Sequence, residues 1–145
     1  MKIHNSYKSS AMDKHHKKGS RAMITPKAYP ELTAEEAASL ISDNSTVGFS
    51  GFTSAGAAKS IPRALAKQAE YLHARGESYK LNVLAGASTG KSLDSALAKA
   101  DAIHKRIGYQ SSKILRQKIN NEEIEFIDTH LSHLPKWYKA GPLAR

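Results

Sequence analysis

The sequence contains no cysteine and no long hydrophobic run, and each absence removes a class of protein. Without cysteine there is no disulfide framework and no thiol nucleophile, which is typical of a protein from a reducing compartment. No stretch approaches the roughly 18 to 20 apolar residues that cross a membrane. We therefore expect a soluble, cytoplasmic protein with no membrane partner. Its 145 residues, 40% of them hydrophobic, suffice for one hydrophobic core.

Acidic residues are also scarce, with 13 against 22 Lys and Arg and a net charge of +9. Residues 1–23 carry six basic residues against Asp13 alone, whereas residues 24–133 hold 13 basic and 12 acidic ones. Because the excess lies at the ends, a basic groove on the folded part is not indicated, and we expect no nucleic-acid partner. A nucleic-acid binder that acts through its basic ends is the alternative, and its binding should vanish when residues 1–23 are removed.

The first 23 residues show neither a helical nor a strand period and contain few large apolar residues. They cannot bury enough surface to order themselves, so we predict a disordered basic tail there. They also lack the apolar core of a secretion signal. Residues 24–145 are predicted to form one domain.

Residues 24–133 alternate between helical and strand patterns. Thr33 and Glu36 form a capping box, which predicts a helix over about residues 34–42. The period then predicts a strand over residues 46–50 and a helix over residues 62–75, which Gly76 ends. The unit repeats with a strand over residues 80–85, a helix over residues 92–100, a short strand through Ile103, a helix around Ile114–Ile119 and a strand over residues 124–127.

This alternation predicts an α/β fold with a parallel or mostly parallel sheet flanked by helices. From His130 the pattern decays, and we expect no complete element around Trp137, Tyr138 and Leu143. An α/β sheet that stopped there would leave an apolar edge uncovered, so the domain is predicted to be truncated at its C-terminal end.

Three loops rich in small residues follow the predicted strands. The first contains Gly51, Gly56 and Lys59, the second is Gly86-Ala-Ser-Thr-Gly90, and the third ends in Ser111 and Ser112. Loops at the carboxyl ends of parallel strands meet at one edge of the sheet, where such folds bind ligands. Glycines let a ligand approach the main chain, and hydroxyls with helix-opening amides suit a carboxylate or a phosphate.

Each of these residues also has a purely structural interpretation. Many strand-to-helix turns contain glycine and bind nothing, and Ser88 or Thr89 could satisfy loop backbone. Ser111 and Ser112 precede a helix and could cap it. The exposed cations Lys59, Arg63 and Arg116 could be solvated, and His130 and His133 lack a third ligand, so we expect no metal site.

With these residues in view, the chain resembles the amino-terminal domain of the acetyl-CoA hydrolase/transferase family, which includes succinyl-CoA:acetate CoA-transferases. The resemblance spans about residues 24–133. Its motifs are Gly51-Phe52-Thr53-x-x-Gly56-x-x-Lys59, Gly86-Ala87-Ser88-Thr89-Gly90 with Leu93-Asp94, Arg106-x-x-Tyr109-Gln110-Ser111 with Arg116 and Ile119-Asn120, and Asp128-x-His130-Leu131.

The resemblance implies that CoA moves between carboxylic acids, or to water, through an acyl-glutamyl anhydride and a glutamyl-CoA thioester. The glutamate lies in the second half of full-length members and is absent here. The implied substrate-binding residues are Thr53, Ser88, Thr89, Ser111 and Arg116, with Gly51, Gly56, Lys59, Gly86 and Gly90 in the cleft loops. Ala58 and Gly108 replace prolines that many members have, which predicts more mobile loops.

The implied partners are acyl-CoA, small carboxylic acids and the missing carboxy-terminal half, with CoA as substrate and no other cofactor. A homo-oligomer is compatible with the sequence. We expect the chain alone to be catalytically inactive. The alternative is a non-catalytic module that binds a carboxylate or CoA with the same loops.

Overall fold

Four parallel strands form the centre of the structure, a computed structural model that describes residues 30–141. The strands lie in the order β1 (Thr46–Phe49), β2 (Leu81–Ala85), β3 (Ile103–Ile107) and β4 (Glu125–Ile127), and each neighbouring pair is parallel. The predicted α/β class with a parallel sheet is confirmed. The predicted tail, residues 1–23, lies outside the described residues.

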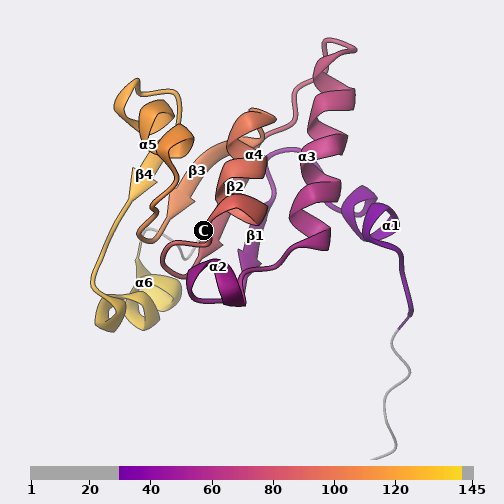
Figure 1. Cartoon of the computed structure of the whole chain (residues 1–145). Helices are drawn as coiled ribbons and strands as arrows, with labels where there is room; N and C mark the ends of the chain where they lie inside the picture. Colours follow the sequence, from indigo (N-terminus) through magenta and orange to yellow (C-terminus); the bar gives the residue numbers. More distant parts are fainter. Residues whose placement is uncertain (1–29, 142–145) are drawn as a thin grey trace, which may run out of the picture. The chain divides into compact units, whose positions relative to one another are not determined.

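Helices connect the strands and pack on the sheet as one layer (Figure 1). The layer consists of α3 (Ser60–His73), the π-helical turn η1 (Lys91–Ser95) that continues into α4 (Ala96–Lys99), and α5 (Lys113–Asn120). Right-handed crossovers that always step to the next strand in the same direction place their helices on the same face of a sheet. The short helix α1 (Ala34–Ser39) packs against α3, with the predicted capping box of Thr33 and Glu36 at its start.

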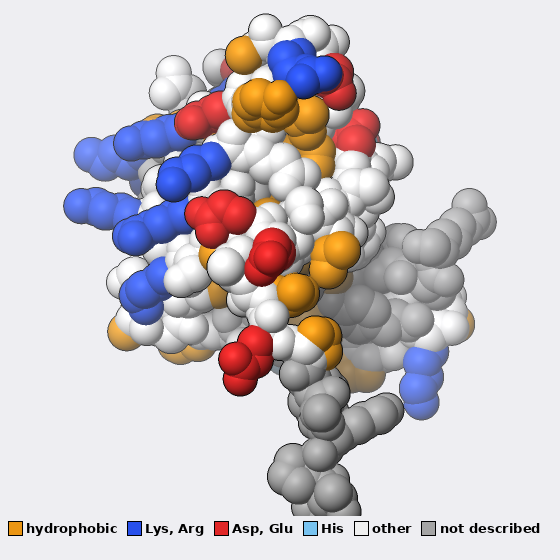
Figure 2. Space-filling model, turned by 90° about the vertical axis from the view of Figure 1, so that its right-hand side faces the viewer, with side chains coloured by type: hydrophobic (Ala, Val, Ile, Leu, Met, Phe, Trp, Pro, Cys, Tyr) orange, Lys and Arg blue, Asp and Glu red, His pale blue; other side chains and the backbone are white. Residues whose placement is uncertain are grey.

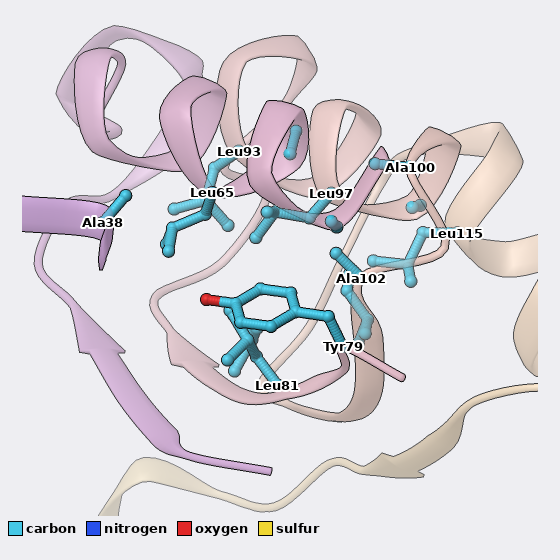
Figure 3. Close-up of a cluster of buried hydrophobic side chains, with 14 of the residues drawn as sticks. Ala38, Leu65, Tyr79, Leu81, Leu93, Leu97, Ala100, Ala102 and Leu115 are labelled. Carbon is cyan, nitrogen blue, oxygen red and sulfur yellow. The ribbon is translucent and has the colours of Figure 1, made fainter. Parts of the chain in front are cut away.

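The hydrophobic core lies between this helical layer and the sheet (Figure 3). Leu65 of α3, Leu97 of α4 and Leu81 of β2 are all fully buried, and burial of one such side chain contributes about 1.5–3 kcal/mol. Tyr79 crosses the same core, and its hydroxyl donates a hydrogen bond to the Ile41 carbonyl at 2.9 Å. Burial, aided by the charge of Asp43, raises the pKa of Tyr79 to about 12.

The opposite face of the sheet carries two rows of aligned residues. The row nearer the amino ends is polar, and within it Lys105 and Glu125 form an ion pair at 2.9 Å. The row nearer the carboxyl ends is apolar, and its members Leu84 and Ile107 are buried outside the main core. In strand order, the polar row consists of Thr46, Asn82, Lys105 and Glu125. The apolar row consists of Gly48, Leu84, Ile107 and Ile127.

The element boundaries differ from the predictions in several places. α1 ends three residues earlier, and α3 begins at Ser60 and ends at His73, so that Pro62 lies within its first turn. The first loop contains an unpredicted short helix, α2 (Thr53–Gly56). The predicted helix over residues 92–100 begins one residue earlier and opens with the π-helical turn η1.

The prediction of no complete element beyond His130 was wrong. A 3₁₀ turn, η2 (Leu131–His133), leads into α6 (Leu134–Ala140). Pro135 occupies the first turn of α6, where its fixed φ and missing amide proton are tolerated, and Leu134 and Trp137 are half-buried one turn apart. The helix is too short for a period of three or four residues to stand out in the sequence. Leu143 lies outside the described residues. No helix in residues 30–141 is long and apolar enough to cross a membrane.

Candidate functional site at the carboxyl edge of the sheet

Three loops lie side by side beyond the carboxyl ends of β1, β2 and β3, and main-chain hydrogen bonds join them. The Thr53 amide donates to the Ala87 carbonyl at 2.9 Å, which joins the first loop to the second. The Ser88 amide donates to the Tyr109 carbonyl at 3.0 Å, which joins the second loop to the third. The three sequence-predicted loops therefore form one continuous wall.

Glycine lets the first two loops make direct backbone contact. A Cβ atom on Gly86 would lie 2.3 Å from the Gly51 carbonyl oxygen, and one on Gly51 would lie 2.3 Å from the Gly56 oxygen. Gly51 also has a φ of 126°, in the region that favours glycine. A larger residue at Gly86 would push the two loops apart, and one at Gly51 would distort the first loop itself.

One side of the wall borders a polar cavity of about 490 Å³. Thr53, Ser88 and Ser111, one from each loop, line this cavity together with Lys59 and Gly90. The sequence predicted all five as site residues. The polar cavity is completed by Ser54, Arg63, Lys91 and Ser92.

The other side of the wall borders an apolar cavity of about 440 Å³ on the face of the sheet opposite the layer of α3, α4 and α5. Gly51, Gly86, Phe52 and Tyr109 of the loops line it, as does Leu134 of α6. Phe52 and Tyr109 are both largely exposed, at 70% and 54%. Adjacent residues of a loop thus face different cavities, since Phe52 precedes Thr53 and Ala87 precedes Ser88.

Two of the hydroxyl residues have unusual backbone conformations. Thr53 has a φ of 61° and Ser88 a φ of 58°, both in the left-handed region. This conformation is rare for a residue other than glycine and is a genuine outlier for a β-branched residue such as threonine. Strained residues of this kind cluster at ligand-binding and catalytic sites.

A buried ion pair supports the second loop from beneath. Arg106 and Asp94 are both completely buried, and the Arg106 Nε donates to Asp94 Oδ1 at 2.9 Å. The remaining guanidinium nitrogens donate to the carbonyls of Ala85 and Gly86, each at 3.2 Å, and to that of Ile107. Arg106 therefore fixes the end of β2, from which the loop carrying Ser88 begins. One signal for this role is present in the sequence: a charged residue at an inward-facing position of β3.

The structure separates the two serines of the third loop. Ser112 caps α5 by accepting a hydrogen bond from the Leu115 amide, and its hydroxyl contacts that of Ser95 at 2.9 Å. Ser111 lies exposed on the polar cavity. The capping interpretation therefore holds for Ser112.

Three further predicted residues do not line the polar cavity. Thr89 is completely buried and its hydroxyl has no hydrogen-bond partner among the described residues, which is costly unless a water or ligand supplies one. Arg116 is exposed on α5, and Gly56 lies within α2. No cluster of residues suited to hold a metal ion is present in the part of the chain that the structure describes.

The charge of the helical layer differs from the expectation drawn from composition. The nearly neutral count in residues 24–133 predicted no basic groove, yet Lys59, Arg63 and Lys91 all line the polar cavity, and no acidic residue of the described chain lines it. Figure 2 shows Lys and Arg side chains gathered along one flank of the molecule. A residue count cannot show this, because the acidic residues lie elsewhere or are paired.

Comparison with known proteins assigns the chain to a family. The model of the acetyl-CoA hydrolase/transferase N-terminal domain matches residues 12–145. The chain belongs to this family. It is 41% identical over 113 residues to a propanoyl-CoA:succinate CoA transferase of Escherichia coli, an alignment that covers 78% of this chain and 23% of that protein.

Two other relatives are named for related activities. A succinyl-CoA:acetate CoA-transferase of Clostridium kluyveri is 40% identical over 106 residues, covering 73% of this chain and 19% of that protein. An acetyl-CoA hydrolase of Kluyveromyces lactis is 37% identical over 111 residues, covering 77% of this chain and 21% of that protein. The acetyl-CoA hydrolase/transferase domain described here thus spans about a fifth of the length of the curated relatives it matches.

Proposed function

We propose that this chain is the amino-terminal part of an enzyme that transfers CoA between an acyl-CoA and a small carboxylate of the acetate or succinate type, or that hydrolyses acetyl-CoA. One observation carries the proposal: Thr53, Ser88 and Ser111, from three different loops, line one polar cavity. Membership of the family and the activities for which the relatives are named support it.

In this proposal the hydroxyls of the polar cavity hold the carboxylate of the acid. Hydroxyls are uncharged donors, so they orient the two oxygens while leaving the carboxylate its charge and its nucleophilicity. The left-handed backbone conformations of Thr53 and Ser88 set the directions in which their side chains leave the main chain before the acid arrives. Thr89 and Arg116 were predicted to join them, and Thr89 is the better candidate because its buried hydroxyl lacks a partner among the described residues.

The covalent steps use a glutamate that this chain does not supply. Its carboxylate attacks the thioester carbonyl of the acyl-CoA, which forms an acyl-glutamyl anhydride and releases the CoA thiolate. The thiolate attacks the glutamyl carbonyl, which gives a glutamyl-CoA thioester and releases the first acid. The carboxylate of the second acid, held in the polar cavity, then attacks the thioester, and the two steps run in reverse. In hydrolysis, water takes the place of the second acid.

The partners that follow are an acyl-CoA, a small carboxylic acid and the polypeptide that carries the glutamate. CoA acts as a substrate, and the proposed chemistry needs no further cofactor. In this proposal the described residues contribute the acid-binding loops, and the carboxy-terminal half of the enzyme contributes the nucleophile.

A coupled assay with succinyl-CoA and acetate tests whether the chain alone can transfer CoA. The chain alone should show no CoA transfer above background, because it holds the acid without the nucleophile. Turnover that disappears in Ser88→Ala would contradict this.

A binding titration with acetate tests the pocket itself. Ser88→Ala and Ser111→Ala should each weaken acetate binding. Ser78→Ala, which changes an exposed serine away from the polar cavity, should not.

The second candidate is a non-catalytic module that binds a carboxylate or CoA. The polar cavity favours it, because Thr53, Ser88 and Ser111 bring their hydroxyls together within the described residues alone. Saturable CoA binding by the chain alone, with no turnover in the presence of any partner polypeptide, would support this candidate.

A further inference from the structure

Three buried polar atoms in the second loop, in η1 and in the third loop have no hydrogen-bond partner among the described residues. They are Thr89 Oγ1, Asp94 Oδ2 and Gln110 Oε1. Thr89 and Asp94 are completely buried, Gln110 is 6% exposed, and none of the three residues lines either cavity. A buried polar group without a hydrogen bond is costly, and folded proteins nearly always supply a partner from the chain or from ordered water.

Two contacts hold the second loop and η1 against the third loop. The amide of Ser88 donates to the carbonyl of Tyr109 at 3.0 Å. Further along both segments, the hydroxyls of Ser95 and Ser112 contact each other at 2.9 Å. The three residues with unpartnered atoms all lie between these contacts, two on the first segment and one on the second. The unpartnered atoms therefore belong to a short interface that is closed at both ends.

The charge of this interface is already balanced. Asp94 Oδ1 accepts a hydrogen bond from Arg106 Nε at 2.9 Å, and both side chains are completely buried. Because the guanidinium compensates the carboxylate, a second positive charge beside Asp94 would have to be desolvated without a negative partner of its own. The missing partner of the three atoms is therefore expected to be neutral and small.

We infer that one buried water molecule binds between Thr89, Asp94 and Gln110 and joins the second loop to the third. The hydrogen-bonding inventory suits one water. The Thr89 hydroxyl donates its proton to the water oxygen, and the water donates one hydrogen to Asp94 Oδ2 and the other to Gln110 Oε1. Three hydrogen bonds are typical of a buried water. A direct bond from the Thr89 hydroxyl to one acceptor would leave the other acceptor without a donor.

The water fixes the separation of two hydroxyls that line the polar cavity. Ser88 directly precedes Thr89 and Ser111 directly follows Gln110, so a bridge between the buried residues also holds the two serines. Thr89 and Gln110 are thus positioning residues that act through their neighbours. This consequence rests on the proposed function, whereas the water site does not. Acetate is the competing partner for the Thr89 hydroxyl, but Thr89 does not line the polar cavity.

A crystal structure of the 145-residue chain, grown without acetate, tests the site directly. It should contain a water oxygen about 2.5–3.0 Å from each of Thr89 Oγ1, Asp94 Oδ2 and Gln110 Oε1. No density at this place, or a water that reaches fewer than the three atoms, would overturn the inference.

The stability of Thr89→Val gives a second test, in which the sign of the effect separates the alternatives. Valine keeps the size of the side chain and removes the hydroxyl. If the water is bound, the variant's unfolding equilibrium constant in acetate-free urea should rise at least about fivefold, because a buried hydrogen bond is lost. A hydroxyl without any partner would instead give a variant at least as stable as the original chain, which would overturn the water site. The control Thr46→Val changes an exposed threonine and should stay within about twofold.

Acetate titration tests the positioning role. Thr89→Val should weaken acetate at least about threefold, because the serines lose their fixed separation, whereas Thr89→Ser keeps the donor and should stay within about twofold. Equal affinities in all three chains would overturn the positioning role. An acetate oxygen in place of the water on Thr89 Oγ1, in crystals grown with acetate, would also overturn it.

The failure of the proposed function has a different signature. If Ser88→Ala leaves the affinity for acetate unchanged, the proposed carboxylate pocket is wrong. The water site is then still decided by the acetate-free crystal structure and by the stability of Thr89→Val, since neither measurement involves an acid.

Discussion

The two cavities at the carboxyl edge of the sheet are built by the same three loops and have opposite chemistry. The polar cavity lies on one side of the loop wall and is lined by hydroxyls and cations. The apolar cavity lies on the other side, over Leu84 and Ile107, and Asp128 is its one charged lining residue within residues 30–141. A loop that alternates apolar and hydroxyl residues can serve both sides, so the wall must be held rigidly for the cavities to stay distinct.

The largest expected effect comes from removing the support that both cavities share. Arg106→Met leaves Asp94 buried without a partner and takes hydrogen-bond donors from the Ala85 and Gly86 carbonyls, which should lower the free energy of unfolding by about 3–5 kcal/mol. Urea unfolding measures this loss.

Two controls make the Arg106 test specific. Arg75→Met breaks the exposed pair with Glu77 and should cost at most about 1 kcal/mol. The double variant Asp94→Leu/Arg106→Met leaves no buried charge and should recover part of the loss. A loss below about 1 kcal/mol in Arg106→Met would mean that the ion pair does not hold the wall.

The next effect comes from the contact between the first two loops. Gly86→Ala places a Cβ against the Gly51 carbonyl oxygen and should lower the free energy of unfolding by about 1–3 kcal/mol, because backbone must move. Gly48→Ala is the matched control: it also borders the apolar cavity, but its Cβ would meet no atom within 4 Å. Equal stability of the two variants, measured by thermal unfolding, would contradict the close packing of the loops.

The neighbouring residues Ser111 and Ser112 are expected to differ in role, because Ser111 lines the polar cavity and Ser112 caps α5. Ser112→Ala removes the cap of α5 and should lower the free energy of unfolding by about 1 kcal/mol without changing acetate affinity. Ser111→Ala should change the free energy of unfolding by less than about 0.5 kcal/mol and should lower the affinity for acetate. Denaturant unfolding and acetate titration of both variants decide the assignment, and a reversed pattern would show that the two roles are exchanged.

The smallest expected effect concerns the apolar cavity. Phe52→Ser/Tyr109→Ser should lower the fluorescence of a bound hydrophobic dye while changing the free energy of unfolding by less than about 0.5 kcal/mol per site, since both side chains are exposed. Tyr71→Ser is the control, because Tyr71 is equally exposed on α3 and borders neither cavity. A matching loss of fluorescence in the control would mean that the dye does not report on the apolar cavity.

The sequence predicted the strands and the position of the loops because both depend on local patterns. The run Leu81–Ala85 is apolar except for Asn82, and strands that alternate with helices at short spacing are parallel, so the loops after them meet at one edge. The grouping of Thr53, Ser88 and Ser111 at one cavity follows from that topology.

What the sequence missed depends on contacts between distant residues. The pairing of Arg106 with Asp94 joins a strand to a helical turn, and neither residue shows its partner in the sequence. The segregation of Lys59, Arg63 and Lys91 around one cavity arises because the starts of α3 and η1 converge there. No local preference predicts the left-handed conformations of Thr53 and Ser88, and the amides of both residues make the loop-to-loop hydrogen bonds.

The central claim is that a small carboxylate enters the polar cavity and not the apolar one. Backbone amide NMR of the chain during titration with acetate tests this most directly, because the two cavities share the loops but differ in their other lining residues. The account predicts saturable shifts at Ser54, Ser88 and Ser111, with Gly48, Leu84 and Ile107 unchanged. Shifts confined to Gly48, Leu84 and Ile107, or no saturable shift at Ser88 and Ser111, would contradict it.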